Sequence, residues 1–191
     1  MLGIGSVATA WCGIQTSQWN GEEARESRDA GLLRTQSSEL FSFGTQKFAY
    51  DANMVAQYAR AVADDDEQAQ QFIRTNLMRP AFLPVVDRWE AEAAAGGAVN
   101  MNLFEDEEYK DSLFSESEAI GAESDAALAR SDDASKNADD YLLMTLLTAT
   151  ALFFAGVTTS FGSKPARLAL LAGSGLILAF TAARLIDLPV A

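Results

Sequence analysis

Two long apolar stretches near the C-terminus constrain this chain more than any other feature of its sequence. Residues 141–161 carry no charge, and residues 166–186 carry charge only near their ends. About 20 residues of helix, rising 1.5 Å each, cross a hydrocarbon core of roughly 30 Å. The residues between the two stretches, Gly162 to Pro165, form a polar turn with glycine and proline as helix breakers. The sequence therefore predicts two transmembrane helices joined as a hairpin, in preference to two buried helices of a soluble protein.

The charged residues are concentrated in the middle of the chain. Of the 191 residues, 27 are acidic and 14 are basic, and residues 20–140 hold 26 of those acids and 11 of those bases. Apolar ends around a solvated acidic middle are typical of a membrane protein and not of a soluble globular enzyme. The acidity also disfavours nucleic acid and anionic lipid head groups as partners of the middle segment.

The residue types exclude several kinds of active site. The chain has no histidine and one cysteine, so Ser-His-Asp and Cys-His arrangements, histidine metal ligands and an intrachain disulfide are impossible. Acidic clusters at residues 64–67 and 105–108 are candidate Ca²⁺ or Mg²⁺ sites, because these ions prefer several carboxylates. Consecutive carboxylates on a helix point in different directions, which favours solvated helix ends instead. We predict no catalytic residue, no cofactor and no metal site.

The N-terminal segment, residues 1–19, admits three interpretations. A signal peptide is suggested by Ala8 to Ala10, which fit the small-x-small cleavage pattern, but the basic n-region is missing. A lipoprotein signal would need a small residue before Cys12, where Trp11 stands. A short first transmembrane helix with Trp11 and Trp19 toward one interface fits best.

The predicted spans contain few groups that could do chemistry. No Asp, Glu or Lys lies in the middle of a span, which weighs against a coupled transporter but not against a pore lined by threonines. Gly173, Ser174 and Gly175 form a small-residue face where a neighbouring helix can approach closely. Tyr141 is expected to anchor the start of the second span at the interface.

The short turn between the last two spans sets the expected orientation. It carries Lys164 and, two residues beyond Pro165, Arg167, without an acidic residue. Because short cytoplasmic loops carry an excess of basic residues, the turn is expected in the cytoplasm. The acidic segment is then expected on the extracytoplasmic side of an inner membrane.

Both arms of the acidic segment show helical periodicity. Along residues 19–62 apolar residues recur at steps of three, four and seven without a proline: Leu33, Leu40, Phe41, Phe48, Val55, Ala59 and Val62. The second arm repeats every seven residues, with Leu113, Ile120, Ala127, Ala134 and Tyr141 beside Ser117, Ser124, Ser131 and Ala138. This predicts one helix over about 105–161. Such small seam residues pack closely but bury little area, which favours oligomerisation or a partner.

A small helical cap is expected between the arms, over about residues 64–95. The run Asp64 to Asp66 suits the N-cap and acidic first turn of a helix from about Asp66 to Met78, and Pro80 or Pro84 suits the first turn of a second helix ending near Ala95. An aromatic set either lines a ligand site or, as we favour, belongs to the core: Phe41, Phe43, Phe48, Tyr50 and Tyr58.

The opening of the chain carries a resemblance. Residues 9–15 read T-A-W-C-G-I-Q and residues 19–24 read W-N-G-E-E-A. They resemble the opening of a widespread family of small uncharacterised bacterial membrane proteins, whose members read T-A-W-S-G-Y-Q and then W-S-G-E-Q-A. The similarity continues at Arg79 to Phe82 with Trp89, and at residues 152–156, so that it covers nearly the whole chain.

The resemblance implies a bacterial inner-membrane protein and supports the first span. It implies no activity, because the family has no established one. This chain departs from the family pattern at Cys12, Ile14 and Glu23, where the family has serine, tyrosine and glutamine.

Together these observations predict an all-α integral membrane protein in the bilayer, with three transmembrane helices at residues 1–19, 141–161 and 166–186. An extended extramembrane helical hairpin is expected over residues 20–140. We predict a non-enzymatic accessory or scaffold protein that forms a homo-oligomer or docks onto a larger membrane complex. The alternative is a homo-oligomeric channel or an extracytoplasmic, sensor-like helical bundle.

Overall fold

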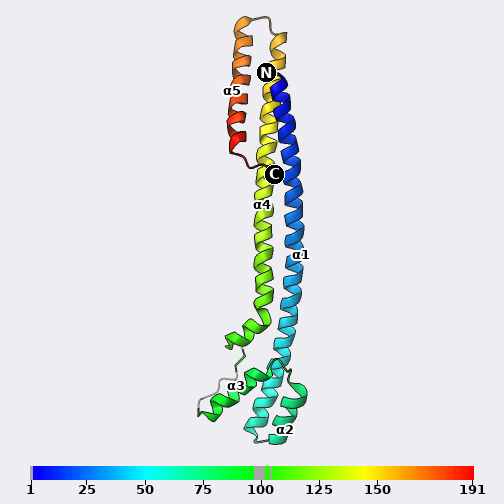
Figure 1. Cartoon of the computed structure of the whole chain (residues 1–191), viewed down its shortest axis with the longest axis vertical. Helices are drawn as coiled ribbons and strands as arrows, with labels where there is room; N and C mark the ends of the chain where they lie inside the picture. Colours follow the sequence, from blue (N-terminus) through cyan, green and yellow to red (C-terminus); the bar gives the residue numbers. More distant parts are fainter. Residues whose placement is uncertain (1, 97–101, 104) are drawn as a thin grey trace. The chain divides into compact units, whose positions relative to one another are not determined.

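The chain forms two compact units, which a computed structural model describes for residues 2–96, 102–103 and 105–191 (Figure 1). Unit 1 comprises Met1–Gly31 and Ser124–Ala191, and unit 2 comprises Leu32–Glu123. Throughout the described residues the regular structure is helical, as the periodicity predicted. Met1 of the predicted first span, and residues 97–101 and 104 of the predicted loop before the second arm, lie outside the described residues.

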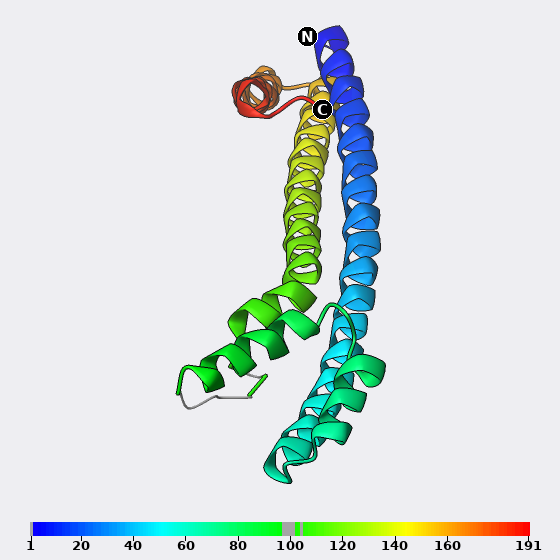
Figure 2. The ribbon, with the colours of Figure 1, turned by 60° about the horizontal axis from the view of Figure 1, so that its bottom comes forward.

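Unit 1 contains three helical segments. The first part of α1 (Leu2–Ala63) lies side by side with the last part of α4 (Glu107–Val157) in both views (Figures 1 and 2). A short 3₁₀ turn, η2 (Thr158–Ser160), then leads to α5 (Lys164–Asp187), which has Pro165 in its first turn. The hairpin predicted at Gly162 to Pro165 is thus present, and the predicted second span is the end of a longer helix.

Two helices in the described part of the chain are long and apolar enough to cross a membrane. They are the last part of α4, continued by η2, and α5. The same measure of length and composition does not include α1, so the first span stays a prediction from the sequence.

Small residues line the contact between α1 and α4 in unit 1. Ala127 and Ala134 are buried there, as their heptad spacing predicted. The hydroxyl of Ser124 donates to the carbonyl of Ala30 (2.9 Å), and that of Ser131 donates to the carbonyl of Glu23 (3.2 Å). Hydrogen bonds from a side chain to the backbone of another helix form only when the two backbones approach closely, which small residues allow.

Unit 2 is built around one apolar cluster. It contains the second part of α1, then α2 (Glu67–Phe72), a π-helical turn η1 (Ile73–Leu77), α3 (Leu83–Ala94) and the first part of α4. Of the acidic run predicted to start the first helix of the cap, Asp66 caps α2, and of the two prolines predicted for the second helix, Pro84 lies in the first turn of α3. The cluster consists of the buried side chains Met54, Val55, Tyr58, Ala61, Ile73, Met78, Phe82, Val85, Val86, Trp89, Leu103 and Tyr109.

The predicted core role of the aromatic set is confirmed for two of its members and wrong for three. Tyr58 is buried and Phe48 packs against the same cluster, whereas Phe41 and Phe43 are each 57% exposed and Tyr50 is 42% exposed. The inward face of α1 in unit 2 also includes the buried Gly44 and Asp51, which lie two heptads and one heptad before Tyr58. Val62, which the apolar repeat of residues 19–62 also included, is exposed as well.

Gly44 marks a close approach of α1 to α4 in unit 2. A Cβ atom at this position would lie 2.9 Å from the carbonyl oxygen of Leu113 and 2.7 Å from the ring of Phe114. The backbone oxygen cannot move aside without disturbing α4, so the contact requires glycine. Gly31, on the same helix, has no such neighbour within 4 Å.

We therefore expect Gly44→Ala and Gly31→Ala to have opposite effects on stability. Forcing a methyl group into a packed contact costs about 1–3 kcal/mol, which exceeds the gain of about 1 kcal/mol from replacing glycine inside a helix. Gly44→Ala should lower the unfolding midpoint, followed by circular dichroism in a mild detergent, and Gly31→Ala should raise it. Equal shifts for the two variants would contradict the close approach.

Candidate functional site

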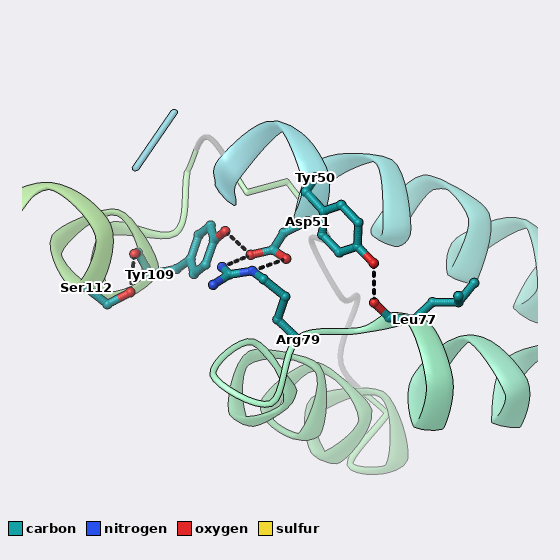
Figure 3. A network of polar contacts seen from close by, with 6 residues as sticks. All are labelled: Tyr50, Asp51, Leu77, Arg79, Tyr109 and Ser112. Carbon is teal, nitrogen blue, oxygen red and sulfur yellow. Dashed lines mark hydrogen bonds and ion pairs between the residues drawn. The ribbon is translucent and has the colours of Figure 1, made fainter. Parts of the chain in front are cut away.

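A buried ionic network joins three segments of unit 2 (Figure 3). Asp51 of α1 is fully buried, and the Arg79 guanidinium binds it with two nitrogens, the Nε–Oδ1 distance being 2.9 Å. The phenol of Tyr109 on α4 donates to the same carboxylate at 2.5 Å. One carboxylate thus holds the segment after η1 and the start of α4 against α1.

The protonation states of this network are fixed by its neighbours. The hydrogen bond to Asp51 raises the pKa of the Arg79 guanidinium, while burial and then the hydrogen bond to Asp51 raise the pKa of the Tyr109 phenol. Both groups therefore remain protonated donors throughout the physiological range. Beside them, the Tyr50 hydroxyl donates to the carbonyl of Leu77 at 2.6 Å, which ties the end of η1 to α1.

Two further arginines hold α3 in place. Arg74 of η1 forms ion pairs with Asp87 and Glu90, and the Tyr58 hydroxyl also donates to Glu90. Arg88 forms ion pairs with Asp106 and Glu108 at the start of α4.

The two acidic clusters that were candidate cation sites contribute helix caps. The Asp66 carboxylate accepts from the backbone N–H of Ala69 (2.9 Å), and that of Asp106 accepts from the backbone N–H of Tyr109 (3.0 Å). Glu105, Asp106, Glu107 and Glu108 also border a hollow of about 480 Å³ together with Arg88. Among the described residues, no three cysteine or carboxylate side chains gather closely enough to hold a metal ion.

These networks bind the chain to itself. Arg74, Arg79 and Arg88 each pair with carboxylates, and every buried polar side-chain atom of the described residues has a hydrogen-bond partner. The arrangement is suited to rigidity, and the surfaces of the two units are the better candidates for function.

The surface of unit 1 is apolar over one part of each of its helices. The exposed large apolar side chains there are Val7, Trp11 and Ile14 on α1; Leu142, Leu143, Leu146, Phe153 and Phe154 on α4; and Leu168, Leu171, Leu176, Phe180 and Ile186 on α5. Such an extent of exposed apolar surface is unfavourable in water. We name these residues the apolar belt.

Polar side chains of α1 and α4 hydrogen-bond to the backbone that follows α5. Trp19 Nε1 and the Tyr141 hydroxyl both donate to the carbonyl of Pro189, at 3.3 and 3.1 Å. The buried amide of Gln15 accepts from the backbone N–H of Ala191 at 2.9 Å. Two of the three predicted interface anchors, Trp19 and Tyr141, are thus brought together, whereas Trp11 lies apart from them in the apolar belt.

The predicted small-residue face of α5 is divided between two environments. Ser174 is buried, and its hydroxyl donates to the carbonyl of Leu170 in its own helix. Gly173 and Gly175 are half-buried, and a Cβ atom on either would meet no atom within 4 Å. Ser174 therefore packs within the chain, while the two glycines leave space beside it.

The predicted seam residues of α4 all face inward, to different degrees. Ala127 and Ala134 are buried in unit 1, whereas Leu113 and Ile120 are half-buried in unit 2. Leu113 packs against the apolar cluster of unit 2.

Sequence reasoning missed the Asp51 network and Gln15. A signal existed in both cases, because a polar residue stands at each site on the inward face of a helix. Asp51 follows Gly44 by one heptad, and Gln15 lies one helical turn from the buried Cys12. The partners could not be found in this way, because Arg79 and Tyr109 are 28 and 58 residues away along the chain.

Comparison of the chain with protein-family models, with curated proteins and with solved structures finds no match. The resemblance to the family of small bacterial membrane proteins therefore stays a prediction from the sequence.

We expect Asp51→Asn to destabilise the protein strongly. Removing one partner of a buried ion pair typically costs 3–5 kcal/mol, and about 3 kcal/mol is expected here because Arg79 is partly exposed. The matched control is Asp87→Asn, which removes an exposed carboxylate from Arg74 and should change stability by less than about 1 kcal/mol. Equal unfolding midpoints of the two variants in denaturant would contradict the role assigned to Asp51.

Proposed function

We propose that this chain is a membrane-anchored scaffold. Unit 1 inserts into an inner membrane through three helices, and unit 2 lies outside the bilayer on the extracytoplasmic side. There it brings copies of the chain together or docks onto a larger membrane complex. The observation that carries the proposal is the apolar belt, which covers part of all three helices of unit 1 and stops where charged residues begin.

The end of the apolar belt supports insertion to a common depth. Along the described residues 15–31 of α1, no large apolar side chain is exposed, and α4 changes from charged to apolar after Asp140, with Leu128 as an isolated exposed side chain before that point. Cys12 of α1, Tyr141 of α4 and Leu185 of α5 belong to one apolar cluster. The apolar parts of the three helices therefore end at a similar depth. At this depth the apolar belt can face lipid while the charged parts of α1 and α4 face water.

The pairing of α1 with α4 supports the first span, at the start of α1. Gly5 lies against Leu152, and Cys12 packs with Tyr141 and Met144. The start of α1 therefore lies beside the apolar part of α4, so that inserting α4 carries residues 2–16 of α1 into the hydrocarbon with it. Val7 and Ile14, which are exposed on this part of α1, are apolar as lipid contact requires.

The burial of several polar residues in unit 1 favours a scaffold over the alternative of a channel. Thr148 and Thr158 are buried, and their hydroxyls donate to the carbonyls of Met144 and Ala155 in α4. Gln15, Ser174 and Thr181 are buried as well. Thr150 and Thr159 are exposed, but they stand among the larger apolar side chains of the belt, which leaves an oligomeric pore few polar groups for its lining.

Exposed aromatic side chains of unit 2 support docking. Phe41 and Phe43 of α1 and Phe72 of α2 each expose more than half of their surface, and the Phe41 ring packs on that of Phe114. Aromatic residues are enriched in protein interfaces, and here they stand on a unit stiffened by the ion pair between Arg79 and the buried Asp51. The basic turn at Lys164 and Arg167 supports the proposed orientation through the positive-inside rule.

Cysteine labelling tests the proposed insertion. In a Cys12→Ala background, single cysteines at Val7 and Phe153 should resist a water-soluble maleimide in intact membranes, because lipid covers both positions. Cysteines at Ser38 and Ser163, both exposed, should react from opposite sides of the membrane.

Labelling of Val7→Cys as fast as Ser38→Cys would contradict the first span. Labelling of all four positions would contradict insertion altogether. Each variant is denatured and labelled again as a control for the reactivity of its thiol.

Particle mass tests the proposed association. Extracted gently in a mild detergent, the protein should run as a homo-oligomer or with a stoichiometric foreign subunit, measured by native mass spectrometry. Phe43→Ser should reduce this association while leaving the helical circular dichroism unchanged, because the side chain is exposed. A lone monomer for the unaltered chain would overturn the scaffold proposal.

A further inference from the structure

Unit 1 contains an apolar cavity between its three helices. It has a volume of about 150 Å³ and is partly open. Its wall is formed by Gly5 and Ala8 of α1, by Thr148 of α4, and by four residues of α5: Leu178, Thr181, Ala182 and Leu185.

The hydroxyl donors in the cavity wall are already in use. The hydroxyl of Thr148 donates to the carbonyl of Met144 (2.7 Å), and that of Thr181 donates to the carbonyl of Ile177 (2.9 Å). Their oxygens can still accept a hydrogen bond, but a polar ligand would lose its hydration without gaining a donor from these side chains. The other side chains of the wall are aliphatic, so that the cavity favours an apolar occupant.

The position of the cavity identifies the source of that occupant. Gly5 packs against Leu152, and Val7, Phe153 and Phe180 of the apolar belt lie on the same parts of the three helices. If unit 1 is inserted as proposed, the open side of the cavity faces hydrocarbon, where acyl chains are the abundant apolar molecules. An empty cavity forfeits dispersion contacts on every side, so a chain that enters gains them.

We infer that the cavity of unit 1 holds the end of one phospholipid acyl chain. The inference rests on the proposed insertion of unit 1 in a membrane. It gives the protein a bound lipid that is recognised through its hydrocarbon and not through its head group, because the cavity has no charged residue in its wall. The lipid acts as a fourth packing element between α1, α4 and α5.

Photo-crosslinking tests this inference at individual residues. The full chain is reconstituted into phosphatidylcholine vesicles in which one acyl chain carries a terminal diazirine, then irradiated and mapped by peptide mass spectrometry. Thr148 and Thr181 are at most 2% exposed, so lipids surrounding the protein do not reach them. Crosslinks at these two residues are expected in addition to crosslinks at the exposed Phe153 and Leu176.

Filling the cavity provides the matched comparison. Ala182→Phe places a ring in the cavity wall and should abolish the crosslinks at Thr148 and Thr181, while those at Phe153 and Leu176 persist. Ala183→Phe, one residue further and outside the wall, should leave both sets unchanged. Ala8→Phe fills the cavity from α1 and repeats the test should Ala182→Phe fold poorly.

The outcomes separate this inference from the function on which it depends. Crosslinks confined to the exposed residues would overturn the bound acyl chain but agree with membrane insertion. This is the result expected if a side chain of a second copy fills the cavity. Crosslinks nowhere would overturn insertion and the inference together. Crosslinks at Thr148 that persist in both filled variants would also overturn the inference.

Discussion

The close approach of α1 and α4 is the constraint on which the rest of the structure depends. In unit 1, Ser124 and Ser131 donate to carbonyls of α1, and in unit 2, Ser37 donates to the carbonyl of Ser117. These bonds are possible only because the facing residues are small. Small residues bury little apolar area, so the contact fixes the register of the two helices while the apolar clusters of the two units supply most of the stability.

The elements of the fold could be predicted because their signals are local. Uncharged length indicates the end of α4 and α5, and the seven-residue repeat of small residues indicates α4 and its inward face. Asp66 and Pro84 mark helix starts by their own chemistry. The two long helices follow from their own sequences, since neither contains an internal proline.

The candidate site could not be predicted to the same extent, because its contacts join residues far apart in the chain. Asp51 stands out as a charge on an inward face, but only the folded chain brings Arg79 and Tyr109 to it. The aromatic residues mislead for a related reason. Helical spacing cannot distinguish a buried face from an exposed one when both carry rings, and the glycine at position 44 decides which face is inside. The predicted span at the start of α1 contains several polar residues, which weaken its hydrophobic signal. The argument that it enters the membrane therefore depends on its packing against the apolar part of α4.

The serine contacts also determine how such a chain can change in length during evolution. The carbonyls of Glu23 and Ala30 and the hydroxyl of Ser37 are spaced seven residues apart on α1, and Ser117, Ser124 and Ser131 are spaced equally on α4. Losing seven residues from both helices at once preserves every remaining pair, because a heptad returns each helix to nearly the same face. Losing a number far from a whole number of turns, such as five, turns the small residues away from their partners. Natural variants should therefore lengthen or shorten both arms together in steps near whole turns, such as seven or eleven residues, and tolerate other insertions only in the connection between the arms.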